Sequence, residues 1–317
     1  MRTIRAGVIG VGYLGQFHAE KYAGMPGVEL VGIADPDRAR AAQVAGKLKT
    51  QACAESSDLL GKVDAVSIVA PTVLHHPIAK QFLDAGVHVL LEKPMTVSLE
   101  QADELIGLAA RKKAILQVGH IERFNPAVAA LKPLLRHPRY LQAERSAPFT
   151  VRCTDVNVVL DLMIHDLDIV CDLAGSPARL VSAAGASIIT RGVDSAVARI
   201  VFENGCVADV AASRVSDEKK RILKVFEGEV LYTADFQSQK ASVSRRGAGA
   251  VPELVPADIA TERRDTLREE IEAFIRSVRE GTRPLVSGAE GRSALALALL
   301  ISRNIEEGMT AFVPLSS

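Results

Sequence analysis

A glycine-rich turn near the start of the chain is the feature that most constrains the fold. Residues 10–15 read Gly-Val-Gly-Tyr-Leu-Gly, an apolar run precedes them at 4–9, and a helical pattern follows at 16–23. A second apolar run, 28–34, ends at an aspartate. This order is the sequence pattern of a βαβ unit that binds a dinucleotide: a strand, a glycine turn, a helix, a second strand and an acid.

Each glycine of this pattern has a physical reason. The first allows the tight turn, the second lets the backbone approach a pyrophosphate, and the third lets the helix pack closely on the strand. The helix amino terminus then offers free N–H groups and a partial positive charge to the phosphates. Without the flanking strands and the acid, the glycines would equally fit a tight βα turn with no ligand. The contacts predicted here are Gly10, Gly12, Tyr13, Leu14 and Gly15.

The acid that ends the second strand bears on the choice of cofactor. A carboxylate at Asp35 can accept hydrogen bonds from ribose hydroxyls, and it repels a 2′-phosphate. This favours NAD, with NADP as the alternative. Arg38, three residues further on, could weaken the preference because it brings a positive charge close to the same position.

Strands and helices alternate over the first 120 residues. We expect a helix at 38–48, a strand at 64–70, a loop leading to His75 and His76, a helix through 85, a strand at 87–91, a helix from 98 to about 111, and a strand at 114–118. This alternation predicts a doubly wound parallel sheet of the Rossmann type, which would form an NAD-binding domain over residues 1–120.

The strand expected at 87–91 ends abruptly in Glu92, Lys93 and Pro94. A proline cannot continue a sheet ladder, and it disfavours helix at the residue before it. A lysine therefore stands at the carboxyl end of a strand, which is the edge where open α/β sheets bind ligands. The alternative is a strand that ends in two solvated charges before a turn.

The pattern changes after His120, and we expect a second domain over 121–317. A helix to about 135, a strand at 140–145 and a helix at 157–174 precede a series of strand-like runs. These runs are 179–189, 195–203, 206–214, 221–227 and 229–235, followed by a loop-rich stretch at 242–260 and helices at 265–280 and 289–307, which end at Gly281 and Gly308. Strands without intervening helices predict an α+β domain with a large, open, mainly antiparallel sheet. The last helices, 265–308, could pack back on the first domain.

The composition excludes several classes of partner. Lys plus Arg equals Asp plus Glu, so the chain has no basic excess for nucleic acid or an anionic membrane. No apolar run is long enough to span a bilayer, and the first residues do not resemble a signal peptide. The four cysteines are scattered, which predicts reduced thiols in a cytoplasmic protein and no metal site.

Asp161 and His165 are four residues apart in the helix expected at 157–174, so they share one helix face. A carboxylate beside an imidazole can hold its tautomer and stabilise its cation, and histidine is a suitable base near neutral pH. The alternative for this pair is an Asp–His contact on an exposed helix surface.

Taken together, these segments make the chain similar to the Gfo/Idh/MocA oxidoreductase family over nearly its whole length. The matching segments are the glycine turn 10–15, Ala70-Pro71-Thr72-Val73-Leu74-His75, Glu92-Lys93-Pro94, and the run 161–168, Asp-Leu-Met-Ile-His-Asp-Leu-Asp. The resemblance implies a Rossmann domain and an open-sheet domain, one face of which often forms an oligomer interface, here of a homodimer or homotetramer. It also implies hydride transfer between a nicotinamide and an alcohol carbon, usually of a sugar or cyclitol.

The resemblance also implies roles for individual residues. Lys93 and His165 match the catalytic lysine and histidine of the family, Asp161 matches the acid of its Asp-x-x-x-His motif, and His75 matches a histidine that often lies near the nicotinamide. In alcohol oxidation, His165 would take the proton and Lys93 would stabilise the developing alkoxide. The second group of cofactor contacts is then Ala70, Pro71, Thr72, His75, Glu92 and Lys93.

The run 119–126, Gly-His-Ile-Glu-Arg-Phe-Asn-Pro, bears on the substrate. It is most similar to family members that oxidise C3 of UDP-N-acetylglucosamine for lipid A precursor synthesis. Arg123 could clamp a phosphate or carboxylate, or it could be a surface residue beside a packed Phe124. Asn125 could bind a hydroxyl or amide group. The substrate contacts predicted are Lys93, His120, Arg123, Asn125, Asp161 and His165.

Two other functions remain open from the sequence. The same chemistry could act on a free sugar, an inositol or a sugar phosphate. The chain could also be an NAD-binding sensor without turnover, although a sensor would need none of Lys93, Asp161 and His165.

Overall fold

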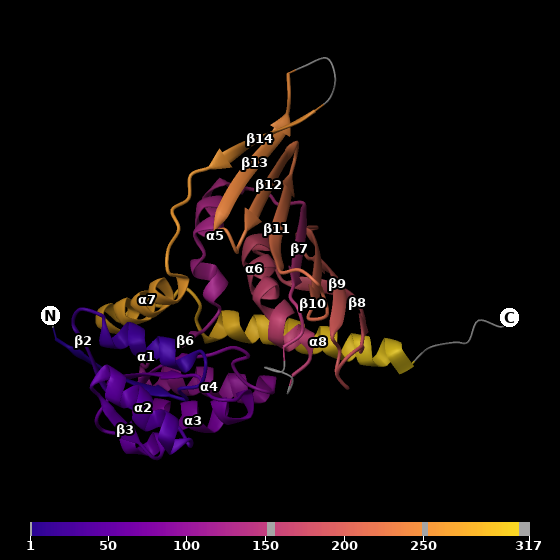
Figure 1. Ribbon diagram of the computed structural model, residues 1–317. Coiled ribbons are helices and arrows are strands. Elements are labelled where there is room, and N and C mark those ends of the chain that lie inside the picture. Colours follow the sequence, from indigo (N-terminus) through magenta and orange to yellow (C-terminus); the bar gives the residue numbers. More distant parts are fainter. Residues whose placement is uncertain (1, 151–155, 249–252, 311–317) are drawn as a thin grey trace. The chain divides into compact units, whose positions relative to one another are not determined.

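The chain folds into two compact units in the computed structural model, which describes residues 2–150, 156–248 and 253–310 (Figure 1). Unit 1 comprises Met1–Ile121 and Asp265–Arg292, and unit 2 comprises Glu122–Arg264 and Ser293–Ser317. The segment 265–292, which the sequence assigned to the second domain with the option of packing back on the first, thus belongs to unit 1.

Unit 1 is built on a six-stranded parallel sheet in the order β3-β2-β1-β4-β5-β6. The strands are β1 (Ile4–Ile9), β2 (Val28–Ala34), β3 (Gln51–Cys53), β4 (Ala65–Ile68), β5 (His88–Leu91) and β6 (Leu116–Val118). The strand order reverses between β1 and β4, and in open α/β sheets such a switch point opens a crevice at the carboxyl ends of the strands. The predicted doubly wound sheet is confirmed, although the short strand β3 was not expected.

Helices cover this sheet. They are α1 (Gly15–Ala23), α2 (Arg38–Leu48), α3 (Thr72–Asp84), α4 (Leu99–Lys112) and α7 (Thr266–Glu280), with a short 3₁₀ helix η1 (Ser56–Leu59). Leu267, Ile271 and Phe274 give α7 an apolar face, which packs with residues of α1 and β1 in one core cluster. His75 and His76 lie inside α3, so the loop expected to contain them is wrong.

Unit 2 contains an eight-stranded sheet in the order β14-β13-β12-β11-β7-β10-β9-β8. The strands are β7 (Tyr140–Ser146), β8 (Ala178–Ala186), β9 (Ser195–Phe202), β10 (Val207–Ser213), β11 (Lys220–Glu227), β12 (Val230–Asp235), β13 (Lys240–Arg246) and β14 (Leu254–Ile259). All neighbouring pairs are antiparallel except β7 and β10, so the mainly antiparallel sheet is confirmed. The loop expected over 242–260 is wrong, since β13 and β14 extend the sheet there.

One face of this sheet is buried under helices of unit 2 (Figure 1). These are α5 (Pro126–Leu131), α6 (Ile164–Ala174) and the part of α8 (Gly288–Thr310) that follows Arg292. The helix expected to about 135 is broken into the 3₁₀ helix η2 (Ile121–Phe124), α5 and η3 (Lys132–Leu134). The helix expected at 157–174 begins with the π-helical turn η4 (Val159–Met163). Gly308, expected to end the last helix, lies inside α8.

The other face of the unit 2 sheet carries a row of apolar side chains. Burial alternates along β9 and β10, with the core-facing residues fully buried and those between them partly exposed. The strand register aligns six residues across neighbouring strands: Leu180, Val201, Val207, Tyr140, Phe226 and Leu231. The rings of Tyr140 and Phe226 lie 5.2 Å apart. We call these six residues the apolar row.

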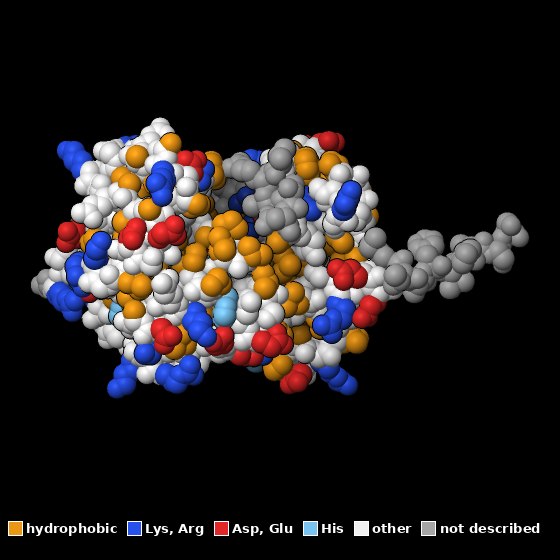
Figure 2. Space-filling view, turned by 90° about the horizontal axis from the view of Figure 1, so that it is seen from below, with side chains coloured by type: hydrophobic (Ala, Val, Ile, Leu, Met, Phe, Trp, Pro, Cys, Tyr) orange, Lys and Arg blue, Asp and Glu red, His pale blue; other side chains and the backbone are white. Residues whose placement is uncertain are grey.

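The surface charges are mixed and the described cysteines are free, as the composition led us to expect. Figure 2 shows acidic and basic side chains interspersed over one face of the molecule. None of the helices in the described ranges is both long and apolar enough to cross a bilayer. Cys53, Cys171 and Cys206 carry free thiols, and Cys153 lies outside the described residues.

Candidate functional site

The glycine turn lies at the switch point of the unit 1 sheet and leaves space for a ligand. A Cβ atom at Gly10, whose φ is +83°, would lie 2.4 Å from the main-chain oxygen of Val69, and one at Gly15 would lie 1.8 Å from that of Gly10. A Cβ at Gly12, in contrast, would meet no other atom of the described residues within 4 Å. Gly10 and Gly15 are therefore required by the fold itself. The space at Gly12, in front of the first turn of α1, fits the pyrophosphate of a dinucleotide.

Asp35 organises this turn as well as ending β2. Its Oδ2 accepts the N–H of Val11 at 2.8 Å, and its Oδ1 accepts the N–H of Asp37 at 2.9 Å and the Arg40 guanidinium at 2.8 Å. Burial raises the pKa of Asp35, but Arg40 and the two N–H groups outweigh it, so the pKa is lowered. The positive charge beside Asp35 therefore comes from Arg40, which the sequence did not single out, and not from Arg38. The Asp37 side chain caps α2 by accepting the N–H of Arg40.

His75 connects the turn after β4 with the turn after β5. It is 1% exposed, and its Nδ1 and Nε2 each lie 2.8 Å from a main-chain oxygen, of Pro94 and Ala70 respectively. Burial lowers the pKa of His75, although both carbonyls and Glu92 act in the opposite direction. His75 thus links the two segments at the cofactor edge, and Pro71 and Thr72 begin α3 beside it.

Lys93 lies two residues beyond the end of β5, at the carboxyl end of the strand as predicted. It is partly exposed, whereas Glu92 and Pro94 on either side are buried. The Oε2 of Glu92 accepts the N–H of Lys93 at 3.2 Å, and the peptide bond between Lys93 and Pro94 is cis. The buried neighbours hold the backbone of this turn, while the lysine side chain remains partly accessible at the carboxyl end of the sheet.

Asp161 and His165 lie on the first turns of the long helix in unit 2. Asp161 belongs to the π-helical turn η4, and His165 lies in the first turn of α6. Both are partly exposed, whereas Asp166 and Asp168 are buried. π-helical turns occur frequently at functional sites. This one places its acid one turn before the histidine.

A buried ion-pair network holds α6 at this point. Arg145 of β7 donates to both carboxylate oxygens of Asp166 at 2.8 and 2.9 Å, and to Glu122 at 2.9 Å. Its guanidinium also lies 5.5 Å from the ring centroid of Phe236. Burial opposes the charge of Arg145, but Asp166 and Glu122 raise its pKa further above the ordinary value. This network fixes the residue next to His165, and no local sequence signal indicated it.

The remaining predicted substrate contacts are deeply buried. Arg123 is 8% exposed and ion-paired with Asp168 at 3.7 Å and Asp172 at 3.0 Å, so it is neither an unpaired clamp nor a surface residue. Asn125 is 2% exposed and caps α5 by accepting the N–H of Ala127. His120 is 1% exposed. Arg123 and Asn125 thus have structural contacts that differ from the roles expected for them.

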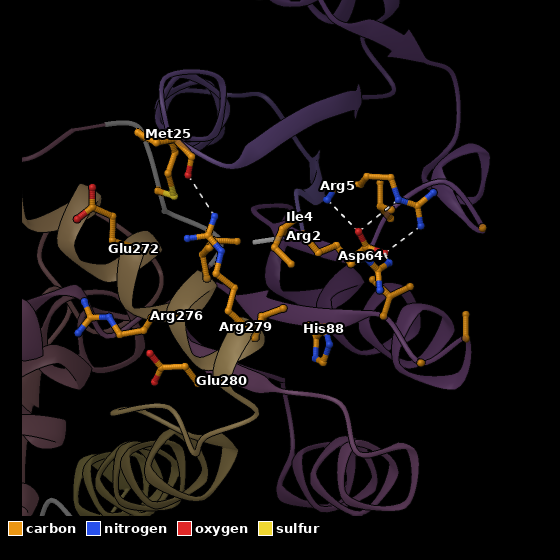
Figure 3. A pocket seen from close by; sticks show the side chains of 18 residues that line it. Arg2, Ile4, Arg5, Met25, Asp64, His88, Glu272, Arg276, Arg279 and Glu280 are labelled. Atoms are coloured by element: carbon orange, nitrogen blue, oxygen red, sulfur yellow. Dashed lines mark hydrogen bonds and ion pairs between the residues drawn. The ribbon is translucent and has the colours of Figure 1, made fainter.

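A cavity of about 1010 Å³ in unit 1 lies away from this chemistry (Figure 3). It is lined at the amino ends of β1, β4 and β5, the edge opposite the glycine turn. Its charges are largely satisfied, since Asp64 pairs with Arg2 and Arg5, and Arg279 donates to main-chain oxygens. Ligands of doubly wound sheets bind at the carboxyl ends. We therefore assign the functional edge to the glycine turn and Lys93.

The fold and these two sets of residues define a nicotinamide-dependent oxidoreductase. Residues 4–120 match the family model described as "Oxidoreductase family, NAD-binding Rossmann fold", and residues 135–232 match the "GFO/IDH/MocA C-terminal domain". The chain belongs to the Gfo/Idh/MocA oxidoreductase family, and its cofactor is NAD.

Individual relatives cover nearly the whole chain. The UDP-N-acetylglucosamine 3-dehydrogenase of Acidithiobacillus ferrooxidans is 42% identical over 96% of this chain and 98% of its own length. A solved structure of that enzyme superposes with a TM-score of 0.93 at 41% identity, covering 97% of this chain and 99% of that one. The scyllo-inositol 2-dehydrogenase (NAD(+)) of Bacillus subtilis is 27% identical over 96% of this chain and 95% of its own length.

Proposed function

We propose that this enzyme oxidises a secondary hydroxyl of a sugar nucleotide with NAD, and that the substrate is UDP-N-acetylglucosamine, oxidised at C3. The observation that carries the proposal is the 42% identity, over almost the full length of both chains, to an enzyme named for that reaction. Lys93, Asp161 and His165 supply the groups that alcohol oxidation requires.

The proposed roles follow from the chemistry of these side chains. Bound NAD supplies the hydride acceptor. His165 takes the hydroxyl proton, because an imidazole is a competent base near neutral pH. Asp161, one turn earlier, orients the imidazole and stabilises its cation. Lys93 places an ammonium at the oxygen where negative charge develops.

The cofactor contacts proposed are the glycine turn, the segment Ala70–Thr72, Asp35 and the Glu92–Lys93 turn. Asp35 is proposed to select NAD because its carboxylate repels a 2′-phosphate. Arg40, ion-paired with Asp35, limits this selectivity, which is the effect expected earlier of Arg38. His75 is proposed to support the nicotinamide end of the site by linking Ala70 to Pro94.

We further propose that the enzyme is cytoplasmic, supplies a 3-keto sugar nucleotide for lipid A precursor synthesis, and forms a homodimer or homotetramer through the open face of the unit 2 sheet. The apolar row supports this interface, because Leu180 is 61% exposed and the other five residues of the row are half-buried on the same face. Apolar side chains left accessible on one sheet face are typical of interaction sites.

A free inositol or sugar is the second candidate substrate, since a relative covering 96% of the chain is named for an inositol. A panel of UDP-sugars, free sugars, sugar phosphates and inositols, with NADH absorbance as the readout, tests the proposal. Reduction of NAD with UDP-N-acetylglucosamine alone is expected. Turnover of a free sugar or inositol without any response to UDP-sugars would move the assignment to the second candidate. No turnover with any of them would favour an NAD-binding sensor.

A further inference from the structure

A buried polar cluster crosses the core of unit 1 beneath the Lys93 turn. Its members come from five elements that are far apart in sequence: α1, β4, the end of β5, β6 and α7. None of them is more than 8% exposed. The cluster consists of His18, Tyr22, Ser67, Glu92, Gln117 and Glu270.

Most of these side chains form a chain of contacts that ends at Glu92. The Tyr22 hydroxyl lies 2.8 Å from Ser67 Oγ, and His18 Nδ1 lies 3.2 Å from the same oxygen. On the other side of the ring, His18 Nε2 lies 3.3 Å from Glu92 Oε1. The second oxygen of Glu92 accepts the N–H of Lys93. One oxygen of the Glu92 carboxyl group thus lies near the imidazole of His18, whose Nε2 has no hydrogen-bond partner among the described residues, and the other oxygen is hydrogen-bonded to the backbone of the Lys93 turn.

Glu270 differs from Glu92 in having no such partners. It is 0% exposed, and neither carboxyl oxygen has a hydrogen-bond partner among the described residues. The amide of Gln117 donates to the main-chain oxygen of Glu270 at 3.1 Å, while the amide oxygen of Gln117 also lacks a partner within the described part of the chain. A negative charge at Glu270 would thus be buried without compensation, and such groups neutralise instead.

The neighbouring carboxylate adds to this effect. Burial raises the pKa of Glu270 well above its ordinary value, and Glu92 raises it further. Two carboxyl groups that share a low-dielectric site do not both ionise. Glu92 has polar neighbours in His18 and the N–H of Lys93, whereas the carboxyl oxygens of Glu270 have no hydrogen-bond partner among the described residues. We therefore place the proton on Glu270.

We propose that Glu270 remains protonated in the native enzyme and acts as a positioning residue: as a neutral acid it lets Glu92 carry the single negative charge that holds the Lys93 turn. Ionisation of Glu270 would place a second negative charge beside Glu92 and disturb the turn at the cofactor edge. The catalytic role of Lys93 rests on the proposed function, whereas NAD binding and folding are measured without a substrate.

The first test compares unfolding of the full-length protein with that of Glu270→Gln between about pH 6 and pH 9. Unfolded Glu270 releases its proton near the ordinary pKa of 4.5, while the native residue keeps it. Stability from this group therefore falls as pH rises, until the native group ionises. The ratio of unfolding constants, unmodified protein over Glu270→Gln, should increase up to about tenfold per pH unit. His18, Tyr22 and Glu92, which also face this site, are common to both proteins.

The matched control is Glu269→Gln, which makes the same change at a partly exposed position of α7. Its ratio should stay flat with pH. A flat ratio for Glu270→Gln as well would show that Glu270 titrates alike in the folded and unfolded states, and would overturn the proposal.

The second test measures NAD affinity across the same pH range. Affinity of the unmodified protein should weaken at the alkaline end as Glu270 ionises, and Glu270→Gln should remove that loss. Glu270→Ala, where it folds, should bind NAD more weakly at neutral pH, with Gln restoring the affinity. The pH at which the unfolding ratio levels off marks ionisation of native Glu270, and identical NAD profiles above that pH would refute the positioning role. If the ratio still rises at about pH 9, Glu270→Ala that folds and binds NAD as tightly as Glu270→Gln at neutral pH would refute it. A failure of the substrate panel would leave both of these readouts intact.

Discussion

Replacing Gly12 with alanine separates the requirements of the cofactor from those of the fold. The added methyl group would meet no protein atom within 4 Å, so stability without NAD should change by less than about 0.5 kcal/mol. The same methyl group occupies the space through which the backbone approaches the pyrophosphate. Overpacking of this kind typically costs about 1–3 kcal/mol, which corresponds to a loss of NAD affinity of roughly 5- to 150-fold.

Two further alanine variants serve as controls for Gly12→Ala. Gly15→Ala would bring Cβ within 1.8 Å of the main-chain oxygen of Gly10, so it should lose stability and NAD affinity together. Gly46→Ala, in α2, also meets open space and should leave NAD affinity unchanged. Calorimetric titration with NAD and thermal unfolding without it give both quantities. A stable Gly12→Ala protein that binds NAD normally would refute the placement of the pyrophosphate at this turn.

The remaining predictions concern single side chains. His165→Asn should lose about 10²–10⁴-fold in hydride transfer, and Asp161→Asn should lose less, without additivity in the double variant; additive losses in single-turnover kinetics would separate the two residues. Arg40→Ala should increase the preference for NAD over NADP by exposing the Asp35 charge, and an unchanged ratio of dissociation constants would contradict this. Burial raises the pKa of Asp194, but the hydroxyl and N–H groups that donate to its carboxylate lower the pKa more strongly. The Asp194 carboxylate therefore stabilises the folded protein above the pKa of the unfolded residue, and this contribution is lost as the pH falls through the folded pKa. Acid unfolding of Asp194→Asn should therefore show a weaker pH dependence.

Elements with an apolar run and a clear stop could be predicted closely from the sequence. The strands Ile4–Ile9 and Val28–Ala34 and the helix Arg38–Leu48 have the expected bounds. The two strands are bounded by glycine and by an acid, and the helix has an aspartate cap. Parallel strands that are buried over much of their length read as nearly continuous apolar runs, so these two strands could be predicted from local composition.

The strands at the edge of the unit 2 sheet show where such reasoning fails. Residues 240–246 include two serines and two arginines, and residues 254–259 include a proline and an aspartate, which do not suggest a strand. β14 is an edge strand and mostly exposed, so its side chains need not be apolar. Its Pro256 is compatible with an edge position, where one side of the strand needs no ladder hydrogen bonds. Pairing with β12 and β13 forms these strands, and that pairing is not visible in a local window.

Contacts between residues that are distant in the sequence also determined the state of single residues of the site. The partners of Arg123, Asp168 and Asp172, follow it by more than forty positions, so nothing beside it in the sequence shows that its charge is neutralised. Arg40 was equally hidden, because its contact with Asp35 depends on how the cap of α2 turns the chain. A motif predicts which side chains reach a site, whereas their charge state depends on distant partners.

Helix α7 has a buried glutamate on its apolar face, which local sequence rules do not explain. Leu267, Ile271 and Phe274 account for its packing on unit 1, and an apolar residue at 270 would extend the same buried face. A glutamate there is destabilising by local rules, since it loses its hydration and gains no hydrogen bond to its carboxyl group. Departures of this kind are expected where stability is sacrificed for function. Among the described residues, the electrostatic neighbour that links Glu270 to the site is Glu92, which precedes Lys93. On the proposal made above, α7 therefore positions the Lys93 turn through Glu270 in addition to covering the sheet.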